Sequence, residues 1–550
     1  MKVPMEPFII FAGLLFSVLA TVILSYISIA TMVGPWIAPT IVLISHILLA
    51  WMRNGKQKTA ALVSIQGIGA GGGIIATGVG FAFPMLYFLD PATFQAMMAK
   101  PWHFCLFTSA LSIIAGGIGL LIGNYLTKNL VDEQELPFPV SNLTVQIATS
   151  NSSSTQSKSL IGGILSTGGI CALRDGFGTF AGVIKKTYYL APSLIGNTAA
   201  LSVWPTLWAI GFSVGLPITI PLVIGMIAKY TVVWPLAQHA LYLPFSLFKP
   251  LEPDTFAIAF CSGLVACELI LQAPGLLKKL WKSKSGAKQS FALYAKLQAL
   301  PNKATTAMRS WSRITIGVTS ALALACMTFL HLYNFSLMAQ ALLIAFSGMA
   351  TYSICTIGGK IGMIPFGRFS TFIVVPLLLL FSLSPLQATI VCVFFNIAAA
   401  AASDLLFDIK SADLVGISRK KMYRYQWLGL IGSALSIGIV LWLLFTNLEL
   451  GSEALFAQRS KAKALLLQSL HMDASIVLLG IGFGWILKRF KVNSTMVFGG
   501  LLMPNGITIG LLLGSLGTLL TKNKERWAPL CAGTLAAESL WVMATILLNK

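Results

Sequence analysis

Charged side chains are scarce in this sequence, and acidic ones are the scarcest. Only 10% of the 550 residues are charged, and 17 of them are Asp or Glu. An ordinary soluble domain carries about 25% charged residues. Too few charges are present to cover the surface of a soluble globule of this length, so the composition excludes an ordinary soluble protein.

Residues that bind metals or form disulfides are also few. None of the eight cysteines forms a CxxC pair, and the five histidines are scattered without an HExxH motif. We therefore expect no metal site and no disulfide, and the cysteines are predicted to be packing residues. P-loop, GxSxG and kinase signatures are missing as well, so we expect no cofactor and no enzymatic activity.

Long apolar runs take the place of these missing residues. Hydrophobic residues make up 56% of the chain, in runs of about 20 residues, which is the length that spans a bilayer as a helix. The alternating pattern of a membrane β-barrel is absent. The sequence predicts an all-α polytopic integral membrane protein with about 16 transmembrane helices, one of them at residues 386–407.

The chain divides into two parts of eight predicted spans each. Residues 278–313 form a basic linker with nine Lys or Arg and no acid, between parts 1–277 and 314–550. ITIPLVIG (218–225) resembles ITIGLLLG (507–514), and SGLVACELI (262–270) resembles AGTLAAESL (532–540). Two matched pairs in the same order predict two parallel 8-helix repeats.

The net charge of +21 reflects membrane topology rather than nucleic-acid binding. With the N-terminus inside, 26 Lys and Arg fall on the inner side and 10 on the outer side. The positive-inside rule then predicts cytoplasmic N- and C-termini. The N-terminal apolar run is kept as the first span, and the expected location is the cell (inner) membrane.

Charges inside predicted spans are candidates for function, because burying a charge in a membrane is costly. Glu268 and Glu538 occupy matching positions of the two repeats, and Lys229 lies within another span. The carboxylates could titrate or contact substrate along a polar pathway. Alternatively, Lys229 could form a structural ion pair with one of them.

Two glycine-rich segments predict broken or very closely packed helices. One contains Gly69, Gly71, Gly72 and Gly73 next to Gln66, a candidate polar contact. Its GxGxxG match lacks the strand that a dinucleotide fold requires. Freed carbonyls lining a cavity and simple close packing remain equal alternatives.

The second segment includes Gly358 and Gly359 with Lys360 and Arg368. It could be a re-entrant turn that presents cations to an anionic substrate. A plain cytoplasmic turn explains the same residues. Asn396, in a long apolar span, is expected to form an interhelical hydrogen bond.

Four segments, in order along the chain, resemble the oligopeptide transporter (OPT) superfamily. They are the glycine-rich stretch from Gln66 to Leu86, ELPFPVSNLTVQIATS (135–150), DLLFDIKSADLVGISRKKMYRYQWLGLIG (404–432) and AGTLAAESL (532–540). The NPG and KIPPR signatures of the fungal and plant peptide-transporting branch are missing. The chain therefore looks closer to the prokaryotic and yellow-stripe-like side.

The resemblance implies a secondary active transporter, with proton-coupled uptake of oligopeptides as the leading function. Transport of metal chelates is the alternative, and a channel or a membrane-embedded enzyme fits less well. The expected partners are a short peptide or other small solute, protons and the lipid bilayer, whereas the oligomeric state stays open. Gln66, Glu268, Glu538, Asn396, Arg368 and Lys229 are the predicted pathway residues.

Overall fold

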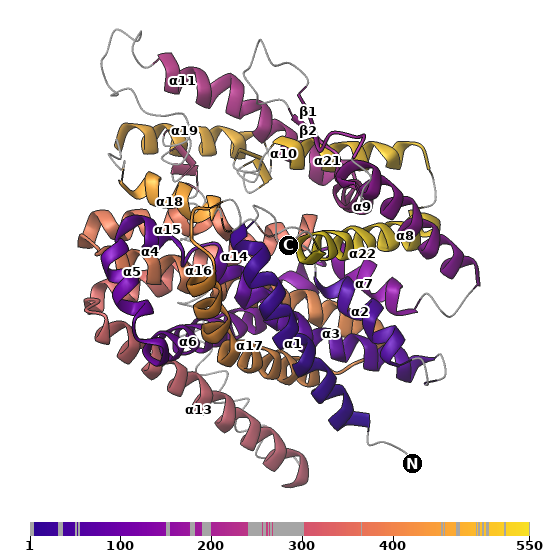
Figure 1. The fold of residues 1–550 in the computed structure, drawn as a ribbon, viewed down its shortest axis with the longest axis horizontal. Coiled ribbons are helices and arrows are strands. Elements are labelled where there is room, and N and C mark those ends of the chain that lie inside the picture. The colour runs from indigo at the N-terminus through magenta and orange to yellow at the C-terminus, as the bar shows by residue number, and fades with distance from the viewer. Residues whose placement is uncertain are drawn as a thin grey trace. The chain divides into compact units, whose positions relative to one another are not determined.

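Helices form most of the chain in the computed structural model, which Figure 1 shows as a ribbon. The structure describes residues 5–30, 37–49, 52, 55–149, 154–176, 182–189, 200–239, 256, 260–261, 263–264, 267, 302–362, 364, 366–452, 455, 457–468, 474–490, 492, 496–497, 500–501, 505–521 and 524–548. Most of the predicted linker 278–313 and the candidate Glu268 therefore lie outside the described residues.

The predicted helical membrane fold is confirmed at this coarse level. Seven helical segments are long and apolar enough to cross a bilayer: Glu6–Ile29, Lys56–Leu89, Pro101–Glu133, Leu216–Leu236, Leu337–Ile361, Pro385–Val415 and Arg419–Asn447. Shorter apolar helices accompany them in the described part of the chain. The count of 16 spans and the two repeats stay predictions.

The contacts divide the chain into two compact units, each built from segments far apart in sequence. The first unit comprises residues 1–232, 341–470 and 495–550, and the second comprises 233–340 and 471–494. These units describe packing, whereas the predicted halves 1–277 and 314–550 concern an internal repeat.

The first unit contains most of the described helices. They are α1 (Met5–Ala30), α2 (Ile37–Leu48), α3 (Lys56–Gly80), α4 (Met85–Leu89), α5 (Pro91–Met98), α6 (Pro101–Thr127), the π-helix η1 (Lys128–Glu133), α7 (Pro139–Thr149), α8 (Ser154–Asp175), α9 (Pro205–Val214), α10 (Leu216–Ala228), α15 (Phe366–Phe381), α16 (Pro385–Val415), α17 (Arg419–Asn447), α18 (Gln458–Gln468), α21 (Asn505–Leu516), the 3-10 turn η4 (Gly517–Leu519) and α22 (Lys524–Leu548). Strand β1 (Thr187–Tyr189) pairs antiparallel with β2 (Ala200–Ser202), with Tyr188 opposite Leu201.

The second unit has fewer described elements. They are α11 (Trp234–His239), α13 (Asn302–Leu332) and α19 (Ala474–Arg489), while η3 (Lys229–Val233) and α14 (Leu337–Ile361) run across unit boundaries. The Phe260 ring packs on Phe483 of α19, with 5.5 Å between the ring centroids.

Helix α16 forms the core of the first unit. Ser384 and Gln387 make a capping box at its start, and Gly416 ends it in a left-handed conformation with φ 79°. Between these signals the helix is buried along nearly its whole length, against α3, α6, α7, α15 and α17. The predicted span 386–407 is therefore too short, because the helix continues to Val415 and no helix-breaking residue occurs before Gly416.

Helix α3 runs unbroken through the first glycine-rich segment. A Cβ atom at Gly72 would overlap the Ser17 carbonyl of α1, and one at Gly73 would overlap the Leu24 side chain. Gly69 likewise faces Phe16 and Ile41, and Gly71 faces the α17 backbone at Gly429. Of the two alternatives, close packing describes these four glycines, and no break opens among them.

Pairs of glycines also bring other helices into backbone contact. Gly211 of α9 lies against the Leu511 carbonyl of α21, and Gly514 of α21 lies against the Trp208 carbonyl of α9. The same reciprocal arrangement joins Gly163 of α8 to Gly533 of α22. Since neither backbone tolerates a Cβ at these points, each crossing depends on both of its glycines.

Candidate functional site

Two carboxylates lie buried on the central helix α16, one helical turn apart. Asp404 is 5% exposed and Asp408 is 2% exposed. Residues four apart share one helix face, so both side chains point to the same side. That face is directed at α3 and α17, which each pack along α16.

Two glutamine amides, one from each neighbouring helix, bind this acidic pair. Gln66 Nε2 of α3 donates a hydrogen bond to Asp408 Oδ1 over 2.8 Å. Gln426 Nε2 of α17 donates to Asp404 Oδ2 over 2.9 Å and also to Asp408 Oδ2. A single amide group thus bridges the two carboxylates, and three helices meet at four polar side chains.

The electrostatic balance of this cluster is unusual for a buried site. Neither Asp404 nor Asp408 forms an ion pair with any residue that the structure describes. Among the described residues, only glutamine amides donate hydrogen bonds to the two carboxylates, and uncompensated buried charge is costly. In addition, the buried Gln66 Oε1 has no hydrogen-bond partner in the described part of the chain.

The loop before α7 packs directly beside this cluster. The Phe138 N–H donates to the Gly359 carbonyl near the end of α14 over 2.8 Å. Its ring meets that of Phe407 edge-on at 5.5 Å, and Ser141 Oγ donates to the Phe407 carbonyl over 2.7 Å. Phe407 precedes Asp408, so Phe138 and the first turn of α7 contact the α16 turn that carries the acid.

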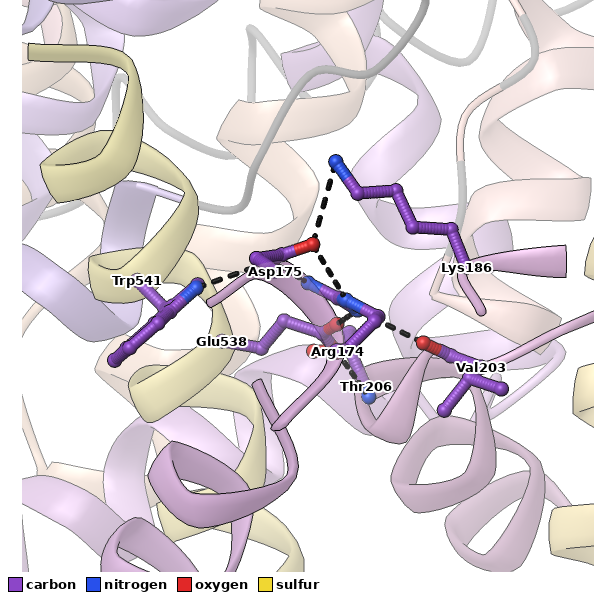
Figure 2. A network of polar contacts seen from close by, with 7 residues as sticks. All are labelled: Arg174, Asp175, Lys186, Val203, Thr206, Glu538 and Trp541. Atoms are coloured by element: carbon purple, nitrogen blue, oxygen red, sulfur yellow. Dashed lines mark hydrogen bonds and ion pairs between the residues drawn. The ribbon is translucent and has the colours of Figure 1, made fainter. Parts of the chain in front are cut away.

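A second buried acidic site contains the predicted candidate Glu538 and is shown in Figure 2. Arg174 Nη1, at the end of α8, lies 2.6 Å from Glu538 Oε1 of α22. The other oxygen, Oε2, accepts a hydrogen bond from the Thr206 backbone N–H over 2.7 Å. Thr206 is in the first turn of α9, where unpaired N–H groups favour an anion.

Arg174 is itself fully engaged. Its Nη2 lies 2.7 Å from Asp175 Oδ2, and its Nη1 also donates to the Val203 carbonyl over 2.8 Å. Trp541 Nε1 donates to Asp175 over 3.0 Å, and Lys186 Nζ lies 3.3 Å from the same carboxylate. This site is a closed ion-pair network that ties α8, α9 and α22 together. The ion-pair partner of Glu538 is therefore Arg174.

The remaining predicted residues do not join either cluster in the described structure. Asn396 is fully buried on α16, where its Nδ2 donates to the Gly78 carbonyl of α3 over 3.1 Å. Lys229 is half-buried at the start of η3. Arg368 lies in the first turn of α15, and Gly358 and Gly359 lie within the continuous helix α14. Glu268 is outside the described residues.

One further buried cation occupies the end of α3. Lys463 of α18 donates from Nζ to the Phe81 carbonyl over 3.1 Å, and the Arg459 guanidinium lies 4.0 Å from the centre of the Phe81 ring. Cations suit the C-terminal end of a helix dipole. Burial lowers the pKa of the Lys463 ammonium to about 8.

Sequence reasoning found Gln66 but missed Asp408, which it contacts, and the neighbouring Asp404. The predicted span 386–407 ends between these two acids, with Asp404 in its last turn and Asp408 just beyond it. Their spacing of four residues and the absence of a breaker before Gly416 are the signals that place both on one buried helix face.

Long apolar helices packed around buried ionisable groups define the class of this molecule, which is a multi-pass membrane protein. The family model described as OPT oligopeptide transporter protein matches residues 7–546, nearly the whole chain. The chain therefore belongs to this family, as its resemblance predicted, and is a transporter of oligopeptide-type substrates. A comparison with curated proteins gave no match.

Proposed function

We propose that this transporter imports short peptides together with protons, and that Asp404 and Asp408 bind the coupling proton. The observation that carries the proposal is the pair of buried carboxylates with amide donors as their only described partners. A proton on one carboxyl group removes one of two buried negative charges. By contrast, Arg174 already compensates Glu538.

Protonation at this site would be transmitted to three helices at once. A protonated Asp408 becomes a hydrogen-bond donor and needs an acceptor. Gln66 Oε1 is buried without a partner, so rotating the amide by half a turn would present this oxygen to the carboxyl group. The same rotation withdraws the present Gln66 donor, which changes the contact between α3 and α16.

The sidedness of the proposal follows from the basic residues of the chain. We place both termini in the cytoplasm of a cell (inner) membrane, because Lys and Arg concentrate on that side. Gln66 and the two aspartates then lie toward the inner end of their helices. A proton entering with the peptide would leave the pair on the cytoplasmic side.

The test is peptide uptake by the purified full chain in liposomes under an imposed proton gradient. The pool should contain di- to hexapeptides together with iron and other metal chelates. We expect uphill peptide accumulation that a protonophore abolishes. Mass spectrometry of the accumulated solute should recover intact peptides, since a carrier does not alter its substrate.

The variant Asp408→Asn assigns the proton site. It mimics a permanently protonated carboxyl group, so we expect accumulation to fall at least about tenfold while peptide counterflow without a gradient persists. Asp413→Asn, an exposed acid on the same helix that pairs with Arg419, is the matched control and should accumulate peptide normally.

Two outcomes would overturn this assignment. Normal gradient-driven accumulation by Asp408→Asn would remove the acidic pair from coupling. Accumulation of chelates rather than peptides would replace the substrate and favour the alternative function.

A further inference from the structure

A basic cavity opens where the first turns of α1 and α17 meet, away from the acidic pair. Its volume is about 420 Å³, and its cations are Lys420, Lys421 and Arg424. Glu6 is the one acid that lines it, and this acid pairs with Lys421 at 3.2 Å. The lining thus carries an excess of two positive charges, which favours an anionic occupant.

The wall of the cavity offers a further polar group. Tyr425 is 3% exposed, and its hydroxyl group interacts with the Lys421 and Glu6 side chains. The Lys421 ammonium lies 5.5 Å from the centre of its ring. A phosphate oxygen can accept charge-assisted hydrogen bonds from the lining cations, which a neutral apolar occupant cannot do.

The cavity continues into an apolar helix face. Ile10 and Leu428 provide its apolar lining. From Leu428 the face continues along α17 through Ile431, Leu435 and Ile439, at the spacing of one helix side. Leu435 is 60% exposed and Ile439 is 50% exposed. An occupant with a phosphate at one end and hydrocarbon at the other matches both parts.

We propose that this cavity binds the headgroup of an anionic phospholipid, with the acyl chains lying along the exposed face of α17. Basic pockets between transmembrane helices bind such headgroups because the pocket has the opposite charge and lies at the level of the headgroups in the membrane. By the positive-inside rule this end of the helices faces the cytoplasm, so the lipid belongs to the inner leaflet. The site is separate from the proposed proton pair and does not depend on it.

The test is native mass spectrometry of the full chain in detergent, titrated with phosphatidylglycerol or phosphatidylcholine. The double variant Lys420→Gln with Arg424→Gln removes two lining charges. We expect about 30-fold weaker binding of phosphatidylglycerol, since each basic residue near the headgroup contributes ~1 kcal/mol. Phosphatidylcholine should bind weakly to both proteins.

A charge-matched control distinguishes binding at this cavity from nonspecific attraction of the anionic lipid to the positively charged protein. Lys56→Gln with Lys128→Gln removes two exposed lysines at the same predicted end, neither of which lines the cavity. This control should bind phosphatidylglycerol like the unaltered chain. The thermal unfolding midpoints of all three proteins without added lipid should agree, which shows that the variants are folded.

Three results would overturn the proposal. The first is unchanged phosphatidylglycerol binding by Lys420→Gln with Arg424→Gln, and the second is an equal loss in the control. The third concerns thermal unfolding. If inorganic phosphate alone raised the unfolding midpoint as much as phosphatidylglycerol does, the cavity would be a site for free anions.

Discussion

The two buried acidic sites of this transporter are balanced in opposite ways. Glu538 lies against Arg174 and a backbone N–H at the start of a helix, and Arg174 also pairs with Asp175. Asp404 and Asp408 lie one turn apart on α16, where their described partners are two glutamine amides and no cation. The first arrangement compensates the charge of the carboxylate with a cation, whereas the second has no described cation to compensate its two carboxylates. Both sites are buried, so burial alone does not distinguish them, whereas their partners do.

The largest loss of stability is expected when the ion pairs of the first site are broken. Arg174→Gln leaves Glu538 and Asp175 buried without their guanidinium, so the free energy of unfolding should fall by about 3–5 kcal/mol. Denaturant titration in detergent, followed by tryptophan fluorescence, measures the loss. Replacing Glu538 by Leu in the same protein should recover part of it. A decrease below about 1 kcal/mol would mean that the network contributes little to stability.

A smaller loss is expected when the amide bridge of the second site is removed. Gln426→Leu deprives two carboxylates of a donor, which costs about 1–3 kcal/mol by the same titration. Gln340→Leu is the control, because Gln340 is similarly buried and its described side-chain hydrogen bond goes to the Phe335 carbonyl, not to a carboxylate. If both variants lose the same stability, the carboxylates do not depend on the Gln426 amide.

Changing the acid itself should have little effect on stability. Asp408→Asn removes one buried charge and keeps a side chain of the same shape, so we expect a change within about 1 kcal/mol. The identical chemical change at the other site, Glu538→Gln, leaves Arg174 less well compensated and should cost more. The comparison fails if the order of these two values is reversed in the unfolding titration.

The smallest expected effect concerns an exposed ion pair. Arg419 binds Asp413 at 2.7 Å and Asp132 at 2.7 Å, but all three side chains are partly exposed. Asp413→Asn should therefore change the free energy of unfolding by about 0.5 kcal/mol, less at high salt. A loss comparable to that of Arg174→Gln would show that exposure does not separate the two networks.

The helical membrane fold was predictable because apolar runs of spanning length dominate the sequence. The glycines of α3 were less informative, since breaks and close packing use the same residue and only the neighbours Ser17 and Leu24 distinguish them. Element ends were hardest where polar residues enter a helix. Asp404 and Asp408 look like the start of a loop until their buried partners are known.

Which charged residues pair with each other could not be predicted from the sequence, for a different reason. Arg174 and Glu538 are 364 residues apart, and the network also needs the Thr206 N–H, which no side-chain pattern reveals. Gln66 and Asp408 are likewise 342 residues apart. Such contacts depend on how helices distant in sequence pack, and residue spacing carries no information about that.

The reciprocal glycine crossings restrict which parts of the transporter can move. At Gly211 and Gly514 the backbones of α9 and α21 touch directly, and Gly225 and Gly500 form a similar contact between α10 and the segment before α21. A helix fixed at two such points can neither slide along its neighbours nor turn about its own axis without separating one of them. We therefore expect helices α9, α10 and α21 to move as a single rigid block, so that any rearrangement during transport would occur at interfaces formed by side chains.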